Sequence, residues 1–346
     1  MLTACFQVAC WLRRTAGHFI RSYGAPIRTS WTAALLCAAL LLPLTAAHAQ
    51  QGPAIIRPGD AAVTGFSGAK VWGDVPSDVL PIDRTFIDTS GAVLQVFDFS
   101  KLGGPPGGQV ATAPATYRAI AGDIGQVFGT ALDSDTANKT PNIYAAATSL
   151  FGLQIVSAEG GRLVKGEPGA RWMPGQFGTG GGPGSIWKID GTTGTVSLFA
   201  NLKHGDKDNS GPGLGALAYD PDSDQIFAAD LEFGLIHRLG RDGHDRGTFD
   251  HGVSGRKAAG LDAIPYDASS RASIERPEFD IEDPFSWGFA DARRIVFALA
   301  VANKRLYYSV EKPLQIWSVG INADGSFADD PRIEIEVTGS PSANLV

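Results

Sequence analysis

The sequence is poor in cysteine. It contains three, Cys5, Cys10 and Cys37, and all of them lie within the first 49 residues. Residues 50–346 therefore carry no thiol, which excludes disulfides, thiolate metal sites, iron–sulfur clusters and cysteine nucleophiles from that part of the chain. Its stability must come from packing, and a chain of this length can bury a sufficient core.

Motifs of hydrolases and zinc enzymes are also missing. The sequence has no Gly-x-Ser-x-Gly nucleophile elbow, which excludes a serine hydrolase of the common α/β type. It has no His-Glu-x-x-His pair, and its histidines after the leader show no other zinc spacing. We expect one of them within a strand as a packed or surface residue and two beside acids in a loop, where they either meet a metal or are solvated. The histidines are His204, His237, His244 and His251.

The glycine-rich segment 175–184 does not have the ending of a phosphate-binding loop. It lacks the Gly-Lys-Ser/Thr sequence and leads into an expected strand, so no helix N-terminus would face an anion. We interpret it as a lid or an ordered loop. Sustained helical periodicity is likewise absent after residue 49, which favours an all-β fold.

Basic residues are few once the leader is set aside. Residues 1–49 contain four arginines and no acid, so 25 basic and 36 acidic residues remain, a formal net charge of −11. This balance excludes nucleic acid and anionic lipid as favoured partners. A glycan, a peptide, a cation or a small neutral metabolite remains a possible partner. The negative charge can equally serve only to keep the protein soluble.

The leader has the pattern of a Sec-type signal peptide. Its arginines precede an apolar run from Trp31 to Ala47, which ends in the small-x-small sequence Ala47-His48-Ala49. We expect cleavage after Ala49 and a periplasmic or secreted protein that has no membrane contact after cleavage. The alternative is an uncleaved anchor, although the run is shorter than the roughly 20 residues that a spanning helix needs.

A triplet of short strands, each ended by a turn, occurs three times in the sequence. Each triplet passes from a small, apolar strand to an aromatic-rich strand and then to a mixed strand. Turn residues such as those of Asp220-Pro221-Asp222 separate the strands. The three copies occupy 127–133, 142–147 and 151–156; 213–222, 225–230 and 234–239; and 296–301, 305–310 and 314–319. Two further hairpins are expected at 85–88 with 93–98 and at 185–189 with 195–199.

Repeated strand triplets predict a β-propeller. The innermost strand of a blade lines a narrow channel, and the next strand packs between blades. Small residues suit the first position and aromatic residues suit the second. The small residues are Gly129, Gly215 and Ala298, and the aromatic residues are Tyr144, Phe227 and Tyr307.

The repeat is unevenly spaced. Gly129 and Gly215 are 86 residues apart, whereas a blade takes about 40 to 50. We infer long inserts at 157–184 and 252–294. The expected organisation is a signal peptide at 1–49, an N-terminal extension at 50–84 and a propeller at 85–346. The fold class is all-β, a propeller of the six-bladed type that is truncated or incompletely closed in this chain.

Acidic residues recur at the ends of the predicted strands. Ends of corresponding strands gather on one face of a propeller, where carboxylates can bind a divalent cation or serve as acid and base. The alternative is that each carboxylate caps a turn by accepting backbone N–H bonds. Thr148 holds this position in the first triplet. The candidate axial ligands are Asp230, Glu311, Glu232, Asp133 and Asp220.

A second candidate cation site is the loop Asp206-Lys207-Asp208-Asn209-Ser210-Gly211. Its alternating oxygen donors, Asp206, Asp208 and Ser210, and its final glycine are typical of a calcium loop. Leu217 occupies the position where such a loop has its last acid. A solvated loop between blades is the alternative interpretation.

The segment 211–220, followed by Ile226-Phe227-Ala228-Ala229-Asp230, resembles the NHL-repeat and SMP-30/gluconolactonase group of propellers. That group shows a Gly-Pro-x-Gly-Leu-Ala-x-Asp start and a Leu-Tyr-Val-Ala-Asp second strand. The resemblance covers one triplet clearly and the other two faintly. It implies a propeller and, for a lactonase, a central divalent cation that polarises a lactone carbonyl and activates water. Asp230 and Glu311 are then the best placed ligands, with calcium or another divalent cation as cofactor.

Three functions follow from the sequence. The first is an exported propeller that binds an unidentified protein, glycan or small ligand on its loop face, without catalysis. The second is a metal-dependent hydrolase or lactonase with its site at the axis. The third is a shortened relative of a longer propeller protein. We favour the first.

Overall fold

The computed structural model describes residues 54–71, 74, 77–78, 85–100, 114–134, 140–149, 165–170, 173, 175–281 and 283–337. Within them the chain is all-β, as the sequence predicts. The elements are mostly antiparallel strands, and the helices are single turns such as α3 (Ala121–Ile124) and α4 (Arg256–Ala258). No described helix has the length and apolar character needed to cross a membrane.

Four sheets make up the body of the fold, and each is a meander of neighbouring antiparallel strands. The first sheet has three strands and the other three have four. Two short ribbons, β2 (Ala69–Val71) with β3 (Thr85–Ile87) and β10 (Lys203–His204) with β11 (Lys207–Asp208), lie outside them. The first sheet is β1 (Asp60–Thr64), β4 (Ala92–Asp98) and β5 (Ala115–Ile120); the second is β6 (Val127–Leu132), β7 (Ile143–Ala147), β8 (Ser185–Ile189) and β9 (Val196–Asn201); the third is β12 (Leu214–Asp220), β13 (Gln225–Asp230), β14 (Leu235–Gly240) and β15 (Asp245–Asp250); the fourth is β16 (Val296–Ala302), β17 (Arg305–Val310), β18 (Gln315–Gly320) and β19 (Arg332–Glu336).

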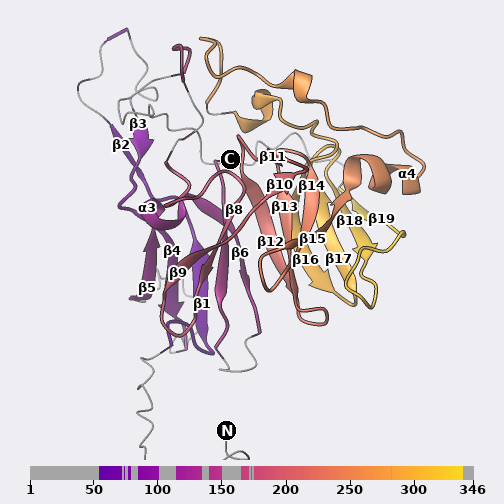
Figure 1. The fold of residues 1–346 in the computed structure, drawn as a ribbon, viewed down its shortest axis with the longest axis horizontal. Helices are drawn as coiled ribbons and strands as arrows, with labels where there is room; N and C mark the ends of the chain where they lie inside the picture. The colour runs from indigo at the N-terminus through magenta and orange to yellow at the C-terminus, as the bar shows by residue number, and fades with distance from the viewer. Residues whose placement is uncertain are drawn as a thin grey trace, which may run out of the picture. The chain divides into compact units, whose positions relative to one another are not determined.

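The sheets stand in a row, face to face, with their first strands together (Figure 1). Strand β12 contacts β6 on one side and β16 on the other. The approach is close because the residues there are small. A Cβ on Gly129 would lie 2.3 Å from the carbonyl oxygen of Gly215, and one on Gly215 would lie 2.8 Å from that of Phe297. Two of the three small residues predicted for the first strands, Gly129 and Gly215, are therefore required by backbone contact between sheets.

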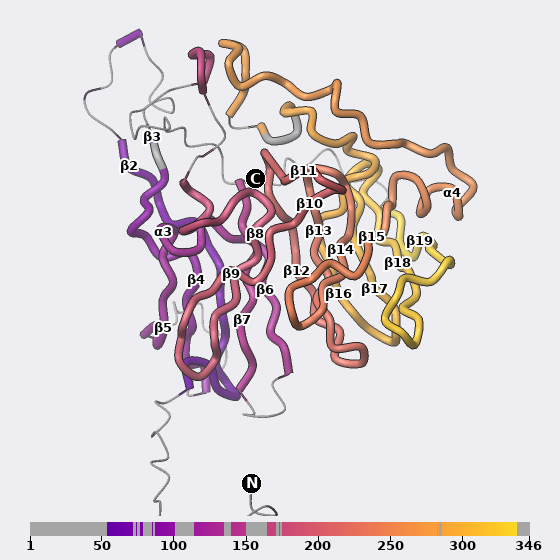
Figure 2. The backbone as a smooth tube through the Cα atoms, in the orientation of Figure 1, coloured from indigo at the N-terminus to yellow at the C-terminus, as the bar shows by residue number. Residues whose placement is uncertain are grey.

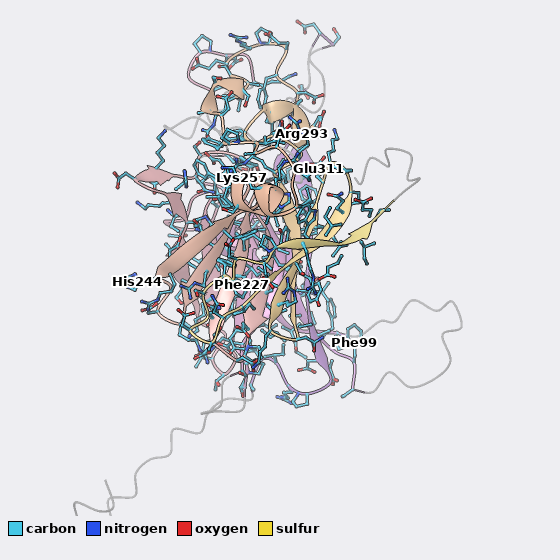
Figure 3. The ribbon with its side chains drawn as sticks, turned by 90° about the vertical axis from the view of Figure 1, so that its right-hand side faces the viewer. Phe99, Phe227, His244, Lys257, Arg293 and Glu311 are labelled. Atoms are coloured by element: carbon cyan, nitrogen blue, oxygen red, sulfur yellow. The ribbon has the colours of Figure 1, made fainter. Side chains whose placement is uncertain are left out.

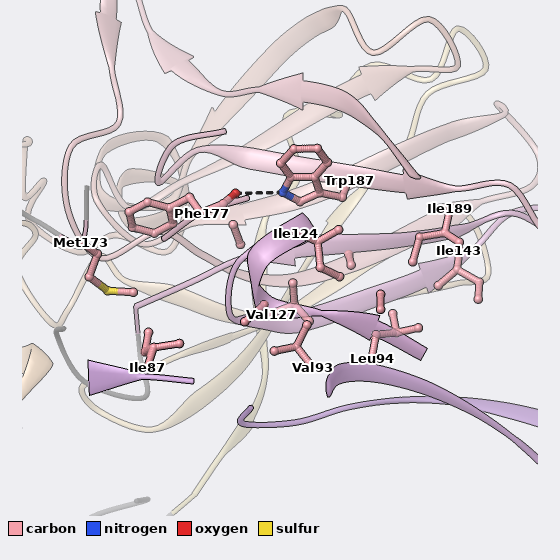
Figure 4. Close-up of a cluster of buried hydrophobic side chains, with 14 of the residues drawn as sticks. Ile87, Val93, Leu94, Ile124, Val127, Ile143, Met173, Phe177, Trp187 and Ile189 are labelled. Atoms are coloured by element: carbon pink, nitrogen blue, oxygen red, sulfur yellow. Dashed lines mark hydrogen bonds between the residues drawn. The ribbon is translucent and has the colours of Figure 1, made fainter. Parts of the chain in front are cut away.

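Apolar side chains fill the space between neighbouring sheets. The largest cluster joins the first two sheets to the segments that follow β7 and β15, and Figure 4 shows part of it. Trp187 of β8 packs there and donates its indole N–H to the carbonyl oxygen of Phe177 at 3.2 Å. Strands β7 and β13 are buried along their whole length, because each lies in a sheet that is covered on both faces.

Two details of the expected pairing were wrong. Residues 85–88 and 93–98 do not form a hairpin: β3 pairs with β2, and β4 pairs with β1 and β5. The second sheet takes its third strand from β8, which pairs with β7, whereas the segment 151–156 expected there lies outside the described residues. In both cases the strand pairs with a partner that is distant in the sequence, and local sequence patterns do not show which distant strand that is.

The two inferred inserts meet at one end of the sheets. Gly166 donates its N–H to the carbonyl oxygen of Ile274 at 2.8 Å, and the N–H of Gly169 donates to Glu275 Oε1 at 2.8 Å. The second insert passes over the ends of the third and fourth sheets as the orange tube in Figure 2. It is not merely polar, since Phe279 and Trp287 are buried in the core cluster that it shares with the first two sheets. We call this end of the sheets the loop face.

Candidate functional site

The loop face carries a buried ion pair that ties the second insert to the third sheet. Glu232 lies in the turn after β13, and its side chain is 1% exposed. Arg271 of the insert donates from Nη2 to Glu232 Oε1 at 2.6 Å. Burial raises the pKa of Glu232, whereas hydrogen bonds from Ser210 and the charge of Arg271 oppose that rise. The carboxylate of Glu232 thus links the turn after β13 to the second insert.

Three loops converge on Glu232. The hydroxyl of Ser210, which follows the β10–β11 ribbon, donates to Oε1 at 2.9 Å, and the N–H of Gly211 donates to Oε2 at 3.0 Å. Arg271 also donates to the hydroxyl of Ser210 at 3.0 Å. The ribbon, the turn after β13 and the second insert therefore share one network, and their relative positions are set before any ligand arrives.

Aromatic side chains surround the guanidinium of Arg271. The ring of Phe289 lies 4.5 Å from it, and those of Tyr266 and Phe233 lie 5.9 Å and 6.0 Å away. The imidazole of His204 lies 4.9 Å from the ring of Phe233, tilted by 38°. His204 is exposed, Tyr266 and Arg271 are half-buried, and Phe233 and Phe289 lie beneath them. We call His204, Tyr266 and Arg271 the aromatic–cationic patch.

Asn209 adds an unusual polar group beside this patch. The residue is 5% exposed, and neither its Oδ1 nor its Nδ2 has a hydrogen-bond partner within the described part of the chain. A buried amide without a hydrogen-bond partner costs free energy, so the position needs an explanation such as a bound water, an ion or a ligand atom. Sequence reasoning treated this loop only as a calcium candidate and missed Asn209, Tyr266 and Arg271, because no local motif links residues so far apart.

Glu311 lies at the same end of the fourth sheet, directly after β17, and Figure 3 shows it at the level of Lys257 and Arg293. Its Oε2 is buried and has no hydrogen-bond partner among the described residues. Burial raises the pKa of this carboxyl to about 7; the nearby Lys312 lowers it and Asp283 raises it further. Glu311 thus keeps an oxygen without a hydrogen-bond partner, as does Asp230, whose Oδ2 only approaches His237 Nε2 at 3.3 Å.

Asp230 caps the turn after β13. Its Oδ1 accepts the N–H groups of Glu232 at 2.8 Å and Phe233 at 3.2 Å. Its Oδ2 lies 3.3 Å from His237 Nε2, and the other ring nitrogen of His237 lies 2.6 Å from Asp245 Oδ2. This Asp–His–Asp series, in which Asp230 and His237 are buried and Asp245 is exposed, joins three strands of the third sheet.

Asp133 and Asp220 lie at the opposite end of the sheets from Asp230. Asp133 directly follows β6, and Asp220 is the last residue of β12, so both lie where a first strand turns into the second. Asp220 Oδ1 accepts the N–H of Asp222 at 3.1 Å. Asp133 accepts from Asn142 Nδ2 at 2.9 Å and from Tyr144 Oη at 3.0 Å, and it pairs with Arg241. The structure thus separates the five candidate axial residues into two groups.

The candidate calcium loop lies partly in a ribbon. Asp208 is exposed and pairs with Lys203 at 2.9 Å, Asp206 is exposed in the turn, and the hydroxyl of Ser210 is bonded to Glu232. In the described part of the chain, no three His, Cys, Asp or Glu side chains are grouped so as to hold a metal ion. A cation role for these residues remains a prediction.

The remaining histidines, His251 and His244, lie outside the candidate site. His251 is fully buried, with its ring 4.6 Å from that of Trp317, and its Nδ1 lies 3.2 Å from Tyr308 Oη. Burial and the charges of Arg256 and Arg294 lower its pKa to about 3. His244 is exposed in the β14–β15 turn, away from the loop face.

No family model matches the sequence, and a comparison with curated proteins yields no match. Solved structures with partial similarity include AztD of Citrobacter koseri (14% identity, TM-score 0.32, 84% of this chain and 60% of that chain). Another is KlAtg21 in complex with the coiled coil of AgAtg16 (11% identity, TM-score 0.32, 68% and 48%). The chain spans less than two thirds of either protein, and at these TM-scores the similarity carries no conclusion about function.

Proposed function

We propose that this protein is an exported, β-propeller-like binding module whose ligand binds at the aromatic–cationic patch on the loop face. The four sheets are its blades, arranged in an incompletely closed ring. The leader sequence supports export to the periplasm or the medium, and the acidic balance supports a ligand other than nucleic acid.

The observation that carries this proposal is the preorganised network around Glu232. It holds His204 of the β10–β11 ribbon against Tyr266 and Arg271 of the second insert. Rigid aromatic and guanidinium groups bind planar or apolar ring faces with little loss of conformational entropy. The free amide of Asn209 supplies a donor and an acceptor next to them. This chemistry suits a glycan, a peptide or a small ligand with a carboxylate or hydroxyl groups.

A glycan array and a peptide library, probed with the full chain, test the proposal. Tyr266→Ala removes an aromatic ring and the hydroxyl that accepts from Arg271 Nη2 at 2.5 Å, but it changes neither Glu232 nor Arg271. We expect about tenfold weaker binding of any hit. Arg293→Ala, an exposed arginine paired with Asp291, is the matched control. Absence of any hit, or a hit bound equally well by the Tyr266 variant, would overturn this assignment.

The second candidate function is a metal-dependent hydrolase, and Glu311 is the observation that favours it. A half-buried carboxyl with one free oxygen can serve as a cation ligand or as a general base. Thermal unfolding with excess calcium and then with EDTA tests it, because a cation that binds the folded state raises the melting temperature. A rise that Glu311→Gln abolishes would support this function. An unchanged melt would eliminate calcium as a cofactor.

A further inference from the structure

The fourth sheet repeats a packing face that is covered in the second and third sheets. In each sheet a small residue of the first strand pairs in register with an aromatic residue of the second strand. A small residue two positions later then pairs with an isoleucine of the third strand. The sets are Ala131, Tyr144, Ala146 and Ile186; Ala218, Phe227, Ala229 and Ile236; and Ala300, Tyr307, Ser309 and Ile316.

The first two sets are buried by the sheet that follows each in the chain. Tyr144, Ala146 and Ile186 are 0% exposed and pack against leucine, isoleucine and alanine side chains of the third sheet. Phe227 and Ile236 are likewise 0% exposed and pack against the fourth sheet. In this protein, a face with this residue pattern is a surface on which another sheet packs.

The third set is open. Ala298, Ala300 and Ala302 are exposed, while Tyr307 and Ile316 are only half-buried. Further out, Ile335 of β19, which pairs with Ile316, is 56% exposed. The opposite face of the same sheet is buried against the third sheet. No described sheet covers this outer face, so it ends the row on one side.

The first sheet ends the row on the other side with an open face of its own. Val63, Gln95 and Arg118 pair across it in register. Val63 is 45% exposed and Arg118 is exposed. Ala61 and Phe97 lie on the same face, whereas the alternating residues Leu94 and Val96 are buried against the second sheet. Figure 1 shows the first and fourth sheets at opposite ends of the row.

We infer that the outer face of the fourth sheet binds the outer face of the first sheet of a second copy of this chain. The contact continues the same sheet-on-sheet series that the chain already forms three times within itself. Within one chain the two open faces do not meet, because the first and fourth sheets lie at opposite ends of the row (Figure 1). Two copies related by a two-fold axis satisfy both open faces at once and place eight sheets in one ring, within the known range of about four to eight blades.

The first test is the mass of the full chain in solution, measured by sedimentation over a range of concentrations. We expect a dimer. Ala300→Glu places a charge in the contact and should raise the dissociation constant at least about hundredfold. Ala258→Glu, which changes an equally exposed alanine of α4, is the matched control and should leave the dimer intact. A monomer at every concentration, or a dimer that Ala300→Glu does not weaken, overturns the inference.

A cross-linking test does not depend on the folding of a charged variant. In a full chain with Cys5, Cys10 and Cys37 changed to Ser, Val63→Cys and Ala300→Cys are introduced together. If the two first strands meet as they do inside the chain, oxidation gives a covalent dimer, because a disulfide needs Cα atoms about 5.5 Å apart. A disulfide within one chain would show closure of a four-sheet ring and overturn the inference. Absence of any disulfide would also overturn it.

Discussion

Arg271 and Glu232 lie 39 residues apart in the chain, yet the guanidinium Nη2 is 2.6 Å from the carboxylate Oε1. Glu232 is buried, so its charge depends on Arg271 and on the N–H groups of Ser210 and Gly211. Removing one partner of a buried pair leaves the other charge without compensation. This contact therefore helps to hold the second insert on the loop face, together with the buried Phe279 and Trp287.

Arg271→Ala should lower the free energy of unfolding by about 3 kcal/mol. The physical reason is the uncompensated carboxylate of Glu232, since Arg271 itself is only 27% exposed. Urea unfolding of the full chain measures the change. Arg293→Ala removes an exposed pair and should cost less than about 1 kcal/mol. Equal losses of stability in the two variants would show that the Glu232–Arg271 contact contributes no more than an exposed ion pair.

His237 predicts a loss of stability at alkaline pH. Burial lowers the pKa of its ring, but the hydrogen bonds and charges of Asp230 and Asp245 outweigh burial and raise the pKa to about 9. An unfolded histidine releases its proton near pH 6.5. The stabilisation is therefore complete below pH 6.5 and is lost as the pH rises through about 9, on the order of 3 kcal/mol in all.

Urea unfolding at steps from about pH 6 to about pH 10 tests this prediction. His237→Gln should be less stable than the wild type at the acidic end, and the difference should shrink toward the alkaline end. A constant difference across the range would mean that His237 does not bind a proton in the folded protein.

His251 predicts the reverse dependence on the acidic side. Burial, together with Arg256 and Arg294, lowers the pKa of its ring to about 3. The folded protein holds the ring neutral while the unfolded chain protonates it below about pH 6.5. The stabilisation present above that pH is lost as the pH falls toward about 3. His251→Gln should therefore lose less stability than the wild type between about pH 6.5 and pH 4, measured by chemical unfolding. Parallel curves would contradict this.

Gly129→Ala should destabilise the contact between β6 and β12. The added Cβ would lie 2.3 Å from the carbonyl oxygen of Gly215, so the two backbones must move apart. Overpacking of this kind costs about 1–3 kcal/mol. Gly65→Ala is the control, since a Cβ there meets no described atom within 4 Å. Thermal unfolding compares the two, and equal melting temperatures would show that the sheets can separate at this point without cost.

Local patterns located most strands of the last two sheets. The predicted segments 225–230 and 305–310 have the same bounds as β13 and β17, because turn residues and apolar runs limit them on both sides. Gly129 and Gly215 were also assigned correctly as small residues of first strands, whereas Ala298 is exposed. Segments 85–88 and 93–98 were paired wrongly, since proximity in sequence suggested a hairpin where β4 has distant partners.

The candidate site was less accessible to sequence reasoning. Glu232 was found as a strand-end acid, but its partner Arg271 lies in an insert that shows no periodicity. Asp133 and Asp220 were grouped with Asp230, although they lie at the far ends of the strands. The sequence shows that an acidic residue stands at the end of a strand. At which end of the sheet that residue lies depends on the direction and pairing of the strand.

The sequence by itself determined the all-β class, the repeated triplets and the small residues between sheets, because alternation, turn chemistry and side-chain size act over a few residues. Only the tertiary structure decided that two inserts meet over the strand ends, that Glu232 is neutralised by Arg271, and that the face around Ala300 and Tyr307 stays open. Those outcomes depend on which distant surfaces bury one another, and that is a property of the packed chain as a whole.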